Sequence, residues 1–130
     1  MIDMTDLSLM GIEKSWLDWE GNQTKFERID SHCIEISTSI LDAFSNNIAF
    51  YLKEKNGLFT LTDLGETYQS IQENTSFNLN PDPIFKQIAK KYHAEFRENI
   101  LSINSISTTN LAPTIQDFKL MIFELTILAN

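Results

Sequence analysis

The sequence is poor in cysteine and glycine and has no long apolar run. Its one cysteine, Cys33, leaves no partner for an internal disulfide bond. The four glycines are isolated from one another, so neither a phosphate-binding loop nor a dinucleotide-binding fingerprint is present. No stretch of apolar residues is long enough to span a membrane, and the first residues lack the basic and apolar regions of a signal peptide. These absences predict a cytoplasmic protein without a membrane segment.

The chain also lacks the residue patterns of metal sites and of nucleophilic catalysis. His32 and Cys33 are adjacent, so in a strand their side chains point to opposite faces, and His93 lies far along the chain. A structural zinc site needs about four ligands. As a nucleophile Cys33 would need a base and an oxyanion donor, whereas a buried thiol in a sheet needs neither. We therefore expect no metal, no cofactor and no catalytic residue, which describes a protein that is not an enzyme.

What the sequence does contain is apolar residues and an excess of acid. Hydrophobic residues make up 42% of the chain and nine of its residues are Phe, which is enough for a folded core in 130 residues. No repeat, low-complexity tract or linker divides it, so residues 1–130 are expected to form a single globular domain. Eighteen acidic and ten basic side chains give a net charge of −8, which disfavours direct binding of nucleic acid.

Residues 5–19 have the apolar spacing of an amphipathic helix. Leu9, Ile12, Trp16 and Trp19 recur at three- and four-residue steps, and Thr5 or Asp6 could cap the helix. A tryptophan stripe of this kind is more often core than interface, although tryptophan is enriched in binding hot spots. The acidic side chains Glu13, Asp18 and Glu20 are expected to form a rim beside it.

Residues 26–62 have the period of two that is typical of strands. Residues 26–29 and 33–38 predict one hairpin, and 48–52 and 58–62 predict a second around Asn56-Gly57, the strongest short hairpin signal in the chain. We expect a small antiparallel sheet of about four to six strands, packed with N-terminal, middle and C-terminal helices. The predicted fold class is α+β.

The second half of the chain is predicted to be mainly helical. A helix capped by Thr62 or Asp63 is expected to end near Asn74, and a second one opens at 81–83. Residues 94–97 and 100–103 could form a small hairpin, and 105–110 are expected to be a loop.

A terminal helix is expected to begin at Pro113. Its apolar face, from Ile115 to Leu128, is wider than one small sheet need cover. This width predicts a two-fold homodimer that is closed through the terminal helix.

The segment that most suggests a functional site is the predicted strand-to-helix junction at Thr62-Asp63-Leu64-Gly65. Such junctions present free backbone N–H groups and recur as places for ligands or catalytic carboxylates. Helix capping by Asp63 explains the same residue types more simply.

Four segments of the chain are similar in order and sequence to one known family, namely Ile34–Thr38, Asn46–Leu52, Leu61–Thr67 and Ile88–Tyr92. In these segments the chain resembles a bacterial and phage family, domain of unknown function 1828, although it has Asn47 where the family tends to have Asp. It implies a small α+β domain that is common on mobile elements, and it brings no established activity.

Three classes of function stay open at this point. The first is a non-enzymatic protein-binding module, an anti-CRISPR or anti-restriction inhibitor from a phage or mobile element whose acidic surface occupies the basic channel of a nucleic-acid-handling enzyme. The second is a metal-dependent nucleic-acid-processing enzyme or accessory that uses Asp63 and neighbouring carboxylates, and the third is a small-molecule sensor. For the first, favoured class, the expected contact residues are Asp18, Glu20, Asp63, Glu66, Glu73, Trp16 and Trp19.

Overall fold

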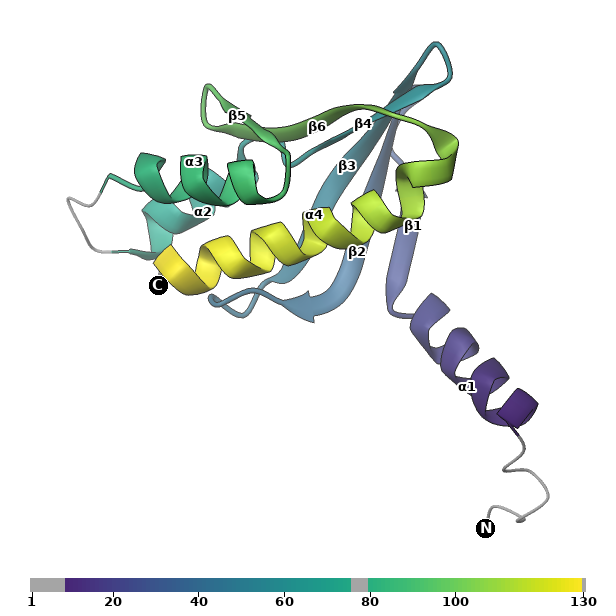
Figure 1. Ribbon diagram of the computed structural model, residues 1–130. Coiled ribbons are helices and arrows are strands. Elements are labelled where there is room, and N and C mark those ends of the chain that lie inside the picture. Colours follow the sequence, from purple (N-terminus) through teal and green to yellow (C-terminus); the bar gives the residue numbers. More distant parts are fainter. Residues whose placement is uncertain (1–8, 76–79, 130) are drawn as a thin grey trace.

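The computed structural model describes residues 9–75 and 80–129, and these residues form four helices and one six-stranded antiparallel sheet (Figure 1). In chain order the elements are α1 (Leu9–Gly21), β1 (Thr24–Arg28), β2 (Cys33–Leu41), β3 (Asn47–Lys55), β4 (Leu58–Thr62), α2 (Glu66–Asn74), α3 (Asp82–Lys91), β5 (Glu95–Arg97), β6 (Ile100–Ile106) and α4 (Thr108–Ala129). The predicted α+β class is confirmed.

The sheet has the order β1-β2-β3-β4-β6-β5, so its first four strands form a meander of hairpins. The hairpin at Asn56-Gly57 is present as predicted, with Lys55 paired to Leu58 and positive φ angles of 55° and 78° at the two turn residues. Two successive positive φ angles match the right-handed twist of the flanking strands, which is why this dipeptide is favoured there. The predicted hairpins β1–β2 and β5–β6 are also confirmed.

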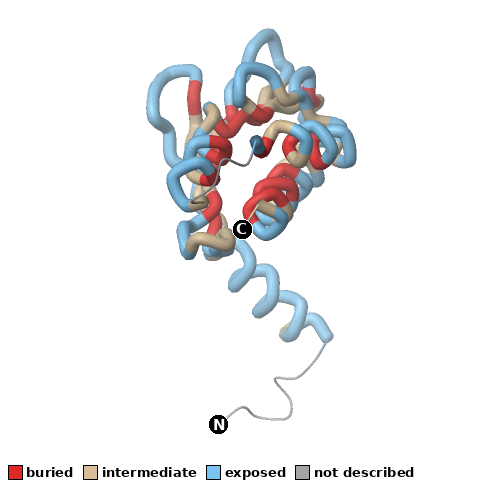
Figure 2. Tube along the Cα trace, turned by 90° about the vertical axis from the view of Figure 1, so that its left-hand side faces the viewer, coloured by how far each residue is buried: buried red, intermediate tan, exposed pale blue. Residues whose placement is uncertain are grey.

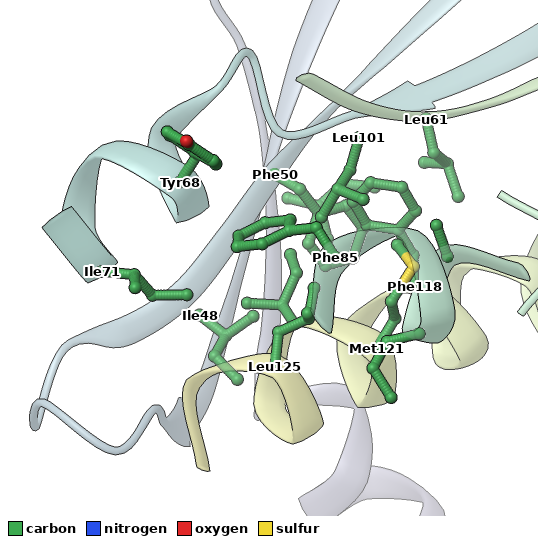
Figure 3. Close-up of a cluster of buried hydrophobic side chains, with 14 of the residues drawn as sticks. Ile48, Phe50, Leu61, Tyr68, Ile71, Phe85, Leu101, Phe118, Met121 and Leu125 are labelled. Carbon is green, nitrogen blue, oxygen red and sulfur yellow. The ribbon is translucent and has the colours of Figure 1, made fainter. Parts of the chain in front are cut away.

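One face of the sheet forms the core together with α2, α3 and α4. Phe50 and Leu61 are fully buried on this face, and α4 places Phe118, Met121 and Leu125 against them (Figure 3). The rings of Phe50 and Phe118 lie 4.9 Å apart between centroids. The predicted buried thiol of Cys33 is confirmed as well, in β2.

The start of the terminal helix differs from the prediction. Residues 105–110 are not a loop, because β6 continues to Ile106 and α4 begins at Thr108, so that Pro113 lies inside the helix. Proline removes one helical hydrogen bond, but the turns that follow are held by the buried face of α4. Leu111 also packs against the core, which favours helix before the proline.

The first helix has the predicted structure, but its surroundings differ from the prediction. α1 forms as expected over residues 9–21, whereas the proposed caps Thr5 and Asp6 lie outside the described residues. None of its residues is buried, and Trp16 and Trp19 are 57% and 55% exposed, so the interpretation of these side chains as core is wrong. The physical reason is topological, because α1 precedes the edge strand β1 and projects away from the sheet (Figures 1 and 2).

α4 also leaves some apolar surface uncovered. Leu120, Phe123 and Ile127 recur at three- and four-residue steps and are exposed, opposite the face that covers the sheet. Self-association through α4 stays a prediction. Among the helices of residues 9–75 and 80–129, none combines the length and apolar character of a membrane span.

Candidate functional site

Among the residues that the structure describes, the most exposed large apolar side chains lie on α1. Its large apolar side chains are all exposed, namely Leu9, Met10, Ile12, Trp16, Leu17 and Trp19. Trp16 and Trp19 lie one turn apart, and their rings stack with a centroid separation of 5.2 Å and an interplanar angle of 29°. The pair therefore forms a flat aromatic surface that no described part of the protein covers.

Only some of the acidic residues of α1 lie beside the tryptophans. Glu13 and Glu20 are three residues before and four residues after Trp16, the spacings that place side chains on one face of a helix. Asp18 is two residues after Trp16, a spacing that turns its side chain away from the aromatic stripe. By this spacing Glu13 and Glu20 border the aromatic stripe and Asp18 does not, and contact of these residues with a partner stays a prediction.

Asp63 is not a surface residue. Its side chain is fully buried between the end of β4 and the start of α2. Its Oδ1 atom accepts hydrogen bonds from the backbone N–H groups of Gly65, at 2.9 Å, and Leu101, at 3.0 Å. The prediction that Asp63 contacts a partner is wrong, because the carboxylate faces the interior and its hydrogen bond from Leu101 links this junction to β6.

The capping prediction for this junction is also wrong. Gly65 is the N-cap residue of α2, with a φ of 81°, and no side chain makes a cap hydrogen bond. A Cβ atom at this position would lie 3.5 Å from the Asn99 carbonyl oxygen, on a backbone conformation that side chains rarely adopt. Glycine is needed here because the chain must turn sharply while Asp63 reaches Leu101.

The environment of Asp63 shifts its pKa upward. Burial raises the pKa of this carboxyl above its ordinary value, and its hydrogen bonds, those from the N–H groups of Gly65 and Leu101 among them, lower the pKa and offset part of this effect. Its second oxygen, Oδ2, is buried and has no hydrogen-bond partner within the described residues. These features describe a structural carboxyl that holds three segments of the chain together.

The two remaining predicted carboxylates lie on α2 and are exposed. Glu66 accepts a hydrogen bond of 2.7 Å from the hydroxyl of Tyr51, and this contact raises the pKa of that phenol. Glu73 accepts a hydrogen bond from the side-chain amide of Gln69 at 3.0 Å. Figure 1 shows α1 at the β1 edge of the sheet and α2 on its other side, so the predicted contact residues form two separate surfaces.

The structure also contains a cleft that sequence reasoning missed. It has a volume of about 200 Å³ and lies between the β2–β3 turn, α2 and α4. Its polar lining consists of Asp42, Asn46, Asn47, Glu66, Thr67, Ser70 and Thr126. These residues are too far apart in sequence for any spacing rule to group them.

The lining of this cleft is already engaged within the domain. Oδ1 of Asp42 accepts hydrogen bonds from the backbone N–H groups of Phe44, at 2.8 Å, and Asn46, at 3.0 Å. The side-chain amide of Asn47 donates to the Thr38 carbonyl at 2.9 Å. Within the described ranges, no three His, Cys, Asp or Glu side chains are grouped so that they could hold a metal ion. The metal-dependent alternative stays a prediction.

Comparisons with known proteins identify a family for this chain but no curated or solved relative. No curated protein and no solved structure matches the chain. The model of the family described as domain of unknown function DUF1828 matches residues 38–124, which is more than half of the chain. The match begins inside β2, so α1 and β1 precede it. From Thr38 onward the meander, the Asp63 junction, the middle helices and most of α4 lie within the matched range, and the chain belongs to the DUF1828 family.

Proposed function

We propose that the protein is a non-enzymatic protein-binding module, and that α1 is the element that docks into its partner. The observation that carries this proposal is an amphipathic helix that has no buried residue and that exposes a stacked tryptophan pair. An isolated helix of this length is only marginally stable in water. A partner that covers its apolar face would stabilise the helix and bury the tryptophans.

The chemistry of α1 fits binding in a groove. Amphipathic helices are recognised through apolar residues at spacings of three, four and seven, and Leu9, Ile12, Trp16 and Trp19 follow that spacing. Each tryptophan contributes roughly 150–250 Å² when buried, and tryptophan is among the residues that dominate binding energy. The groove of the partner is therefore apolar and wide enough for two indole rings.

The negative charge of this protein favours a partner whose groove has a basic rim. Glu13 and Glu20 border the aromatic stripe, and the whole chain carries −8, so a basic rim on the partner would be complementary and would speed association. Proteins that handle nucleic acids have such basic surfaces. We place this protein among inhibitors or adaptors of nucleic-acid-handling enzymes, with anti-CRISPR or anti-restriction action as the specific form.

Glu66 and Glu73 on α2 give this proposal a second, weaker acidic surface. Their separation from α1 means that one small groove cannot engage both helices. We therefore assign the main contact to α1, and we expect α2 to contribute mainly through long-range attraction, which salt screens.

The test is affinity capture from a lysate of the source organism with the wild-type protein and with a Trp16→Ala/Trp19→Ala variant. We expect a basic, nucleic-acid-binding protein that the wild type retains, that the variant loses and that high salt releases. Phe123→Ala is the matched control, since Phe123 is an exposed aromatic residue on α4.

A second pair of variants tests the charged rim. Glu20→Gln should weaken capture more than Asp18→Asn, because only Glu20 lies on the same face as Trp16. Equal capture by the wild type and the tryptophan variant, or an acidic partner, would contradict the proposal.

A further inference from the structure

The edge of the sheet at β1 has an unpaired row of backbone groups. Ile29 donates its N–H to the Cys33 carbonyl, and the Gln23 carbonyl accepts from Ser39, so odd-numbered residues point their backbone groups toward β2. Because this direction alternates along an antiparallel strand, the N–H and C=O groups of Thr24, Phe26 and Arg28 point outward. All of β1 after Thr24 is exposed.

The sequence of β1 is complementary to itself when the strand is reversed. In an antiparallel pair centred on Phe26, Phe26 lies opposite Phe26 of a second copy, and Thr24 lies opposite Arg28 of that copy. This register uses every outward N–H and C=O group of the strand. It also places Lys25 opposite Glu27 of the second copy, and two-fold symmetry repeats that pair.

The charged side chains of β1 favour this register over the registers that are shifted by two residues. Sliding the pairing by two residues in either direction brings Lys25 opposite Lys25, or Glu27 opposite Glu27, and like charges directly opposite are destabilising. Either slide also leaves an outward-pointing residue of each copy without a partner. Hydrogen bonding and charge therefore select the same register.

The position of Glu27 within the sheet also favours this register. Within the sheet Glu27 lies directly opposite Glu35 of β2, an unfavourable pair of like charges. The one ion pair in residues 9–75 and 80–129 joins Lys91 of α3 to Glu124 of α4, so it does not involve Glu27. A lysine brought to the open side of Glu27 would offset its repulsion from Glu35.

We infer that β1 pairs antiparallel with β1 of a second copy of this chain, about a two-fold axis at Phe26, so that two sheets join into one continuous sheet. This interface is distinct from the α1 surface, and it does not depend on the proposed function. An exposed edge strand otherwise remains open to unspecific pairing.

The opposite edge of the sheet is less suited to such pairing. β5 has only three residues, Glu95–Arg97, and its alternation with β6 leaves only Phe96 pointing outward. The pairing at β1 engages three outward residues from each copy. It is still short by the standards of stable interfaces, so a reversible dimer is expected.

Antiparallel pairing has a consequence for α1. It brings the Thr24 end of each β1, where α1 leaves the sheet, next to the β1–β2 turn of the other copy. That turn carries Ile29, which is 55% exposed.

The test uses the variants Lys25→Glu and Glu27→Lys. Alone, each variant would place like charges opposite each other twice, and we expect dimerisation about tenfold weaker than that of the wild type. Mixed in equal amounts, the two variants again present opposite charges at both positions. They should therefore form a one-to-one heterodimer with close to wild-type affinity, measured by native mass spectrometry and sedimentation.

A backbone variant gives an independent check. Phe26→Pro removes an outward N–H group, and an edge strand tolerates proline there without losing its pairing to β2. We expect a folded monomer by circular dichroism and light scattering. A wild-type monomer at high micromolar concentration overturns the inference. It is also overturned by a dimer that survives Phe26→Pro and Lys25→Glu but is lost in Phe123→Glu, because that result assigns self-association to α4.

Discussion

α1 and α4 have similar apolar patterns but very different environments. α4 contacts β3, β4 and β6 in the middle of the sheet and buries Phe118, Met121 and Leu125 completely. α1 is attached to the edge strand and buries no residue. A helical apolar period therefore predicts that a helix forms, whereas its position in the topology decides whether the chain itself supplies the surface that covers it.

The largest expected effect separates the two helices by their contribution to stability. Phe118→Ala should lower the free energy of unfolding by about 3–5 kcal/mol, because it opens a cavity against Phe50. Trp16→Ala should change it by less than about 0.5 kcal/mol, as for an exposed site. Urea unfolding followed by far-ultraviolet circular dichroism is the suitable measurement, since both tryptophans of the chain lie on α1 and their fluorescence would not report on the core. Equal costs for the two variants would mean that α1 packs against the domain in solution.

A smaller difference in the free energy of unfolding is expected between variants of two aspartates, the buried Asp63 and Asp18 on α1. Asp63→Ala should cost about 3 kcal/mol, because it leaves the N–H groups of Gly65 and Leu101 without their acceptor. Asp18→Ala on α1 should cost less than about 0.5 kcal/mol. Asp63→Asn is the matched control, since its amide oxygen can still accept both hydrogen bonds. A cost near 1 kcal/mol for Asp63→Ala would indicate that the residue contributes no more than an ordinary helix cap.

The smallest effect concerns pH. Burial raises the pKa of Asp63 above the unfolded value of about 3.9. The folded state therefore binds this proton more tightly, and the resulting stability is full below the unfolded pKa and is lost as pH rises through the folded pKa. The measurement is the difference in unfolding free energy between the wild type and Asp63→Asn over a pH series.

This difference should shift in favour of the asparagine variant as pH increases from about 4. Glu124 has the opposite dependence, because the hydrogen bond from Lys91 lowers its pKa, but it is present in both proteins and cancels. A difference that does not change with pH would contradict the raised pKa of Asp63.

The parts of the fold that were predictable from sequence depend on neighbouring residues. The turn at Asn56-Gly57 needs only two residues that accept positive φ angles. α3 follows in the same way from a proline in its first turn and a basic last turn. The start of α4 was missed because Pro113 favours a helix beginning, while burial of Ile106 and packing of Leu111 extend regular structure around it.

The candidate site was less predictable, because its decisive contacts join distant residues. The hydrogen bond from Leu101 to Asp63 spans 38 positions in the sequence and depends on the pairing of β4 with β6. No local pattern shows that this pairing turns the carboxylate inward. The Trp16 and Trp19 stripe was identified, but its exposure follows from the edge position of β1, which the sequence does not specify.

The position of α4 after all six strands has a consequence for synthesis of the chain. The meander of β1 to β4 can form from local hairpins as it leaves the ribosome. Its apolar face, with Phe50 and Leu61, then stays only partly covered until Phe118 and Leu125 have been added to the growing chain. During this interval the nascent protein is a partly covered sheet, and it is at this stage that a chaperone would have most to bind.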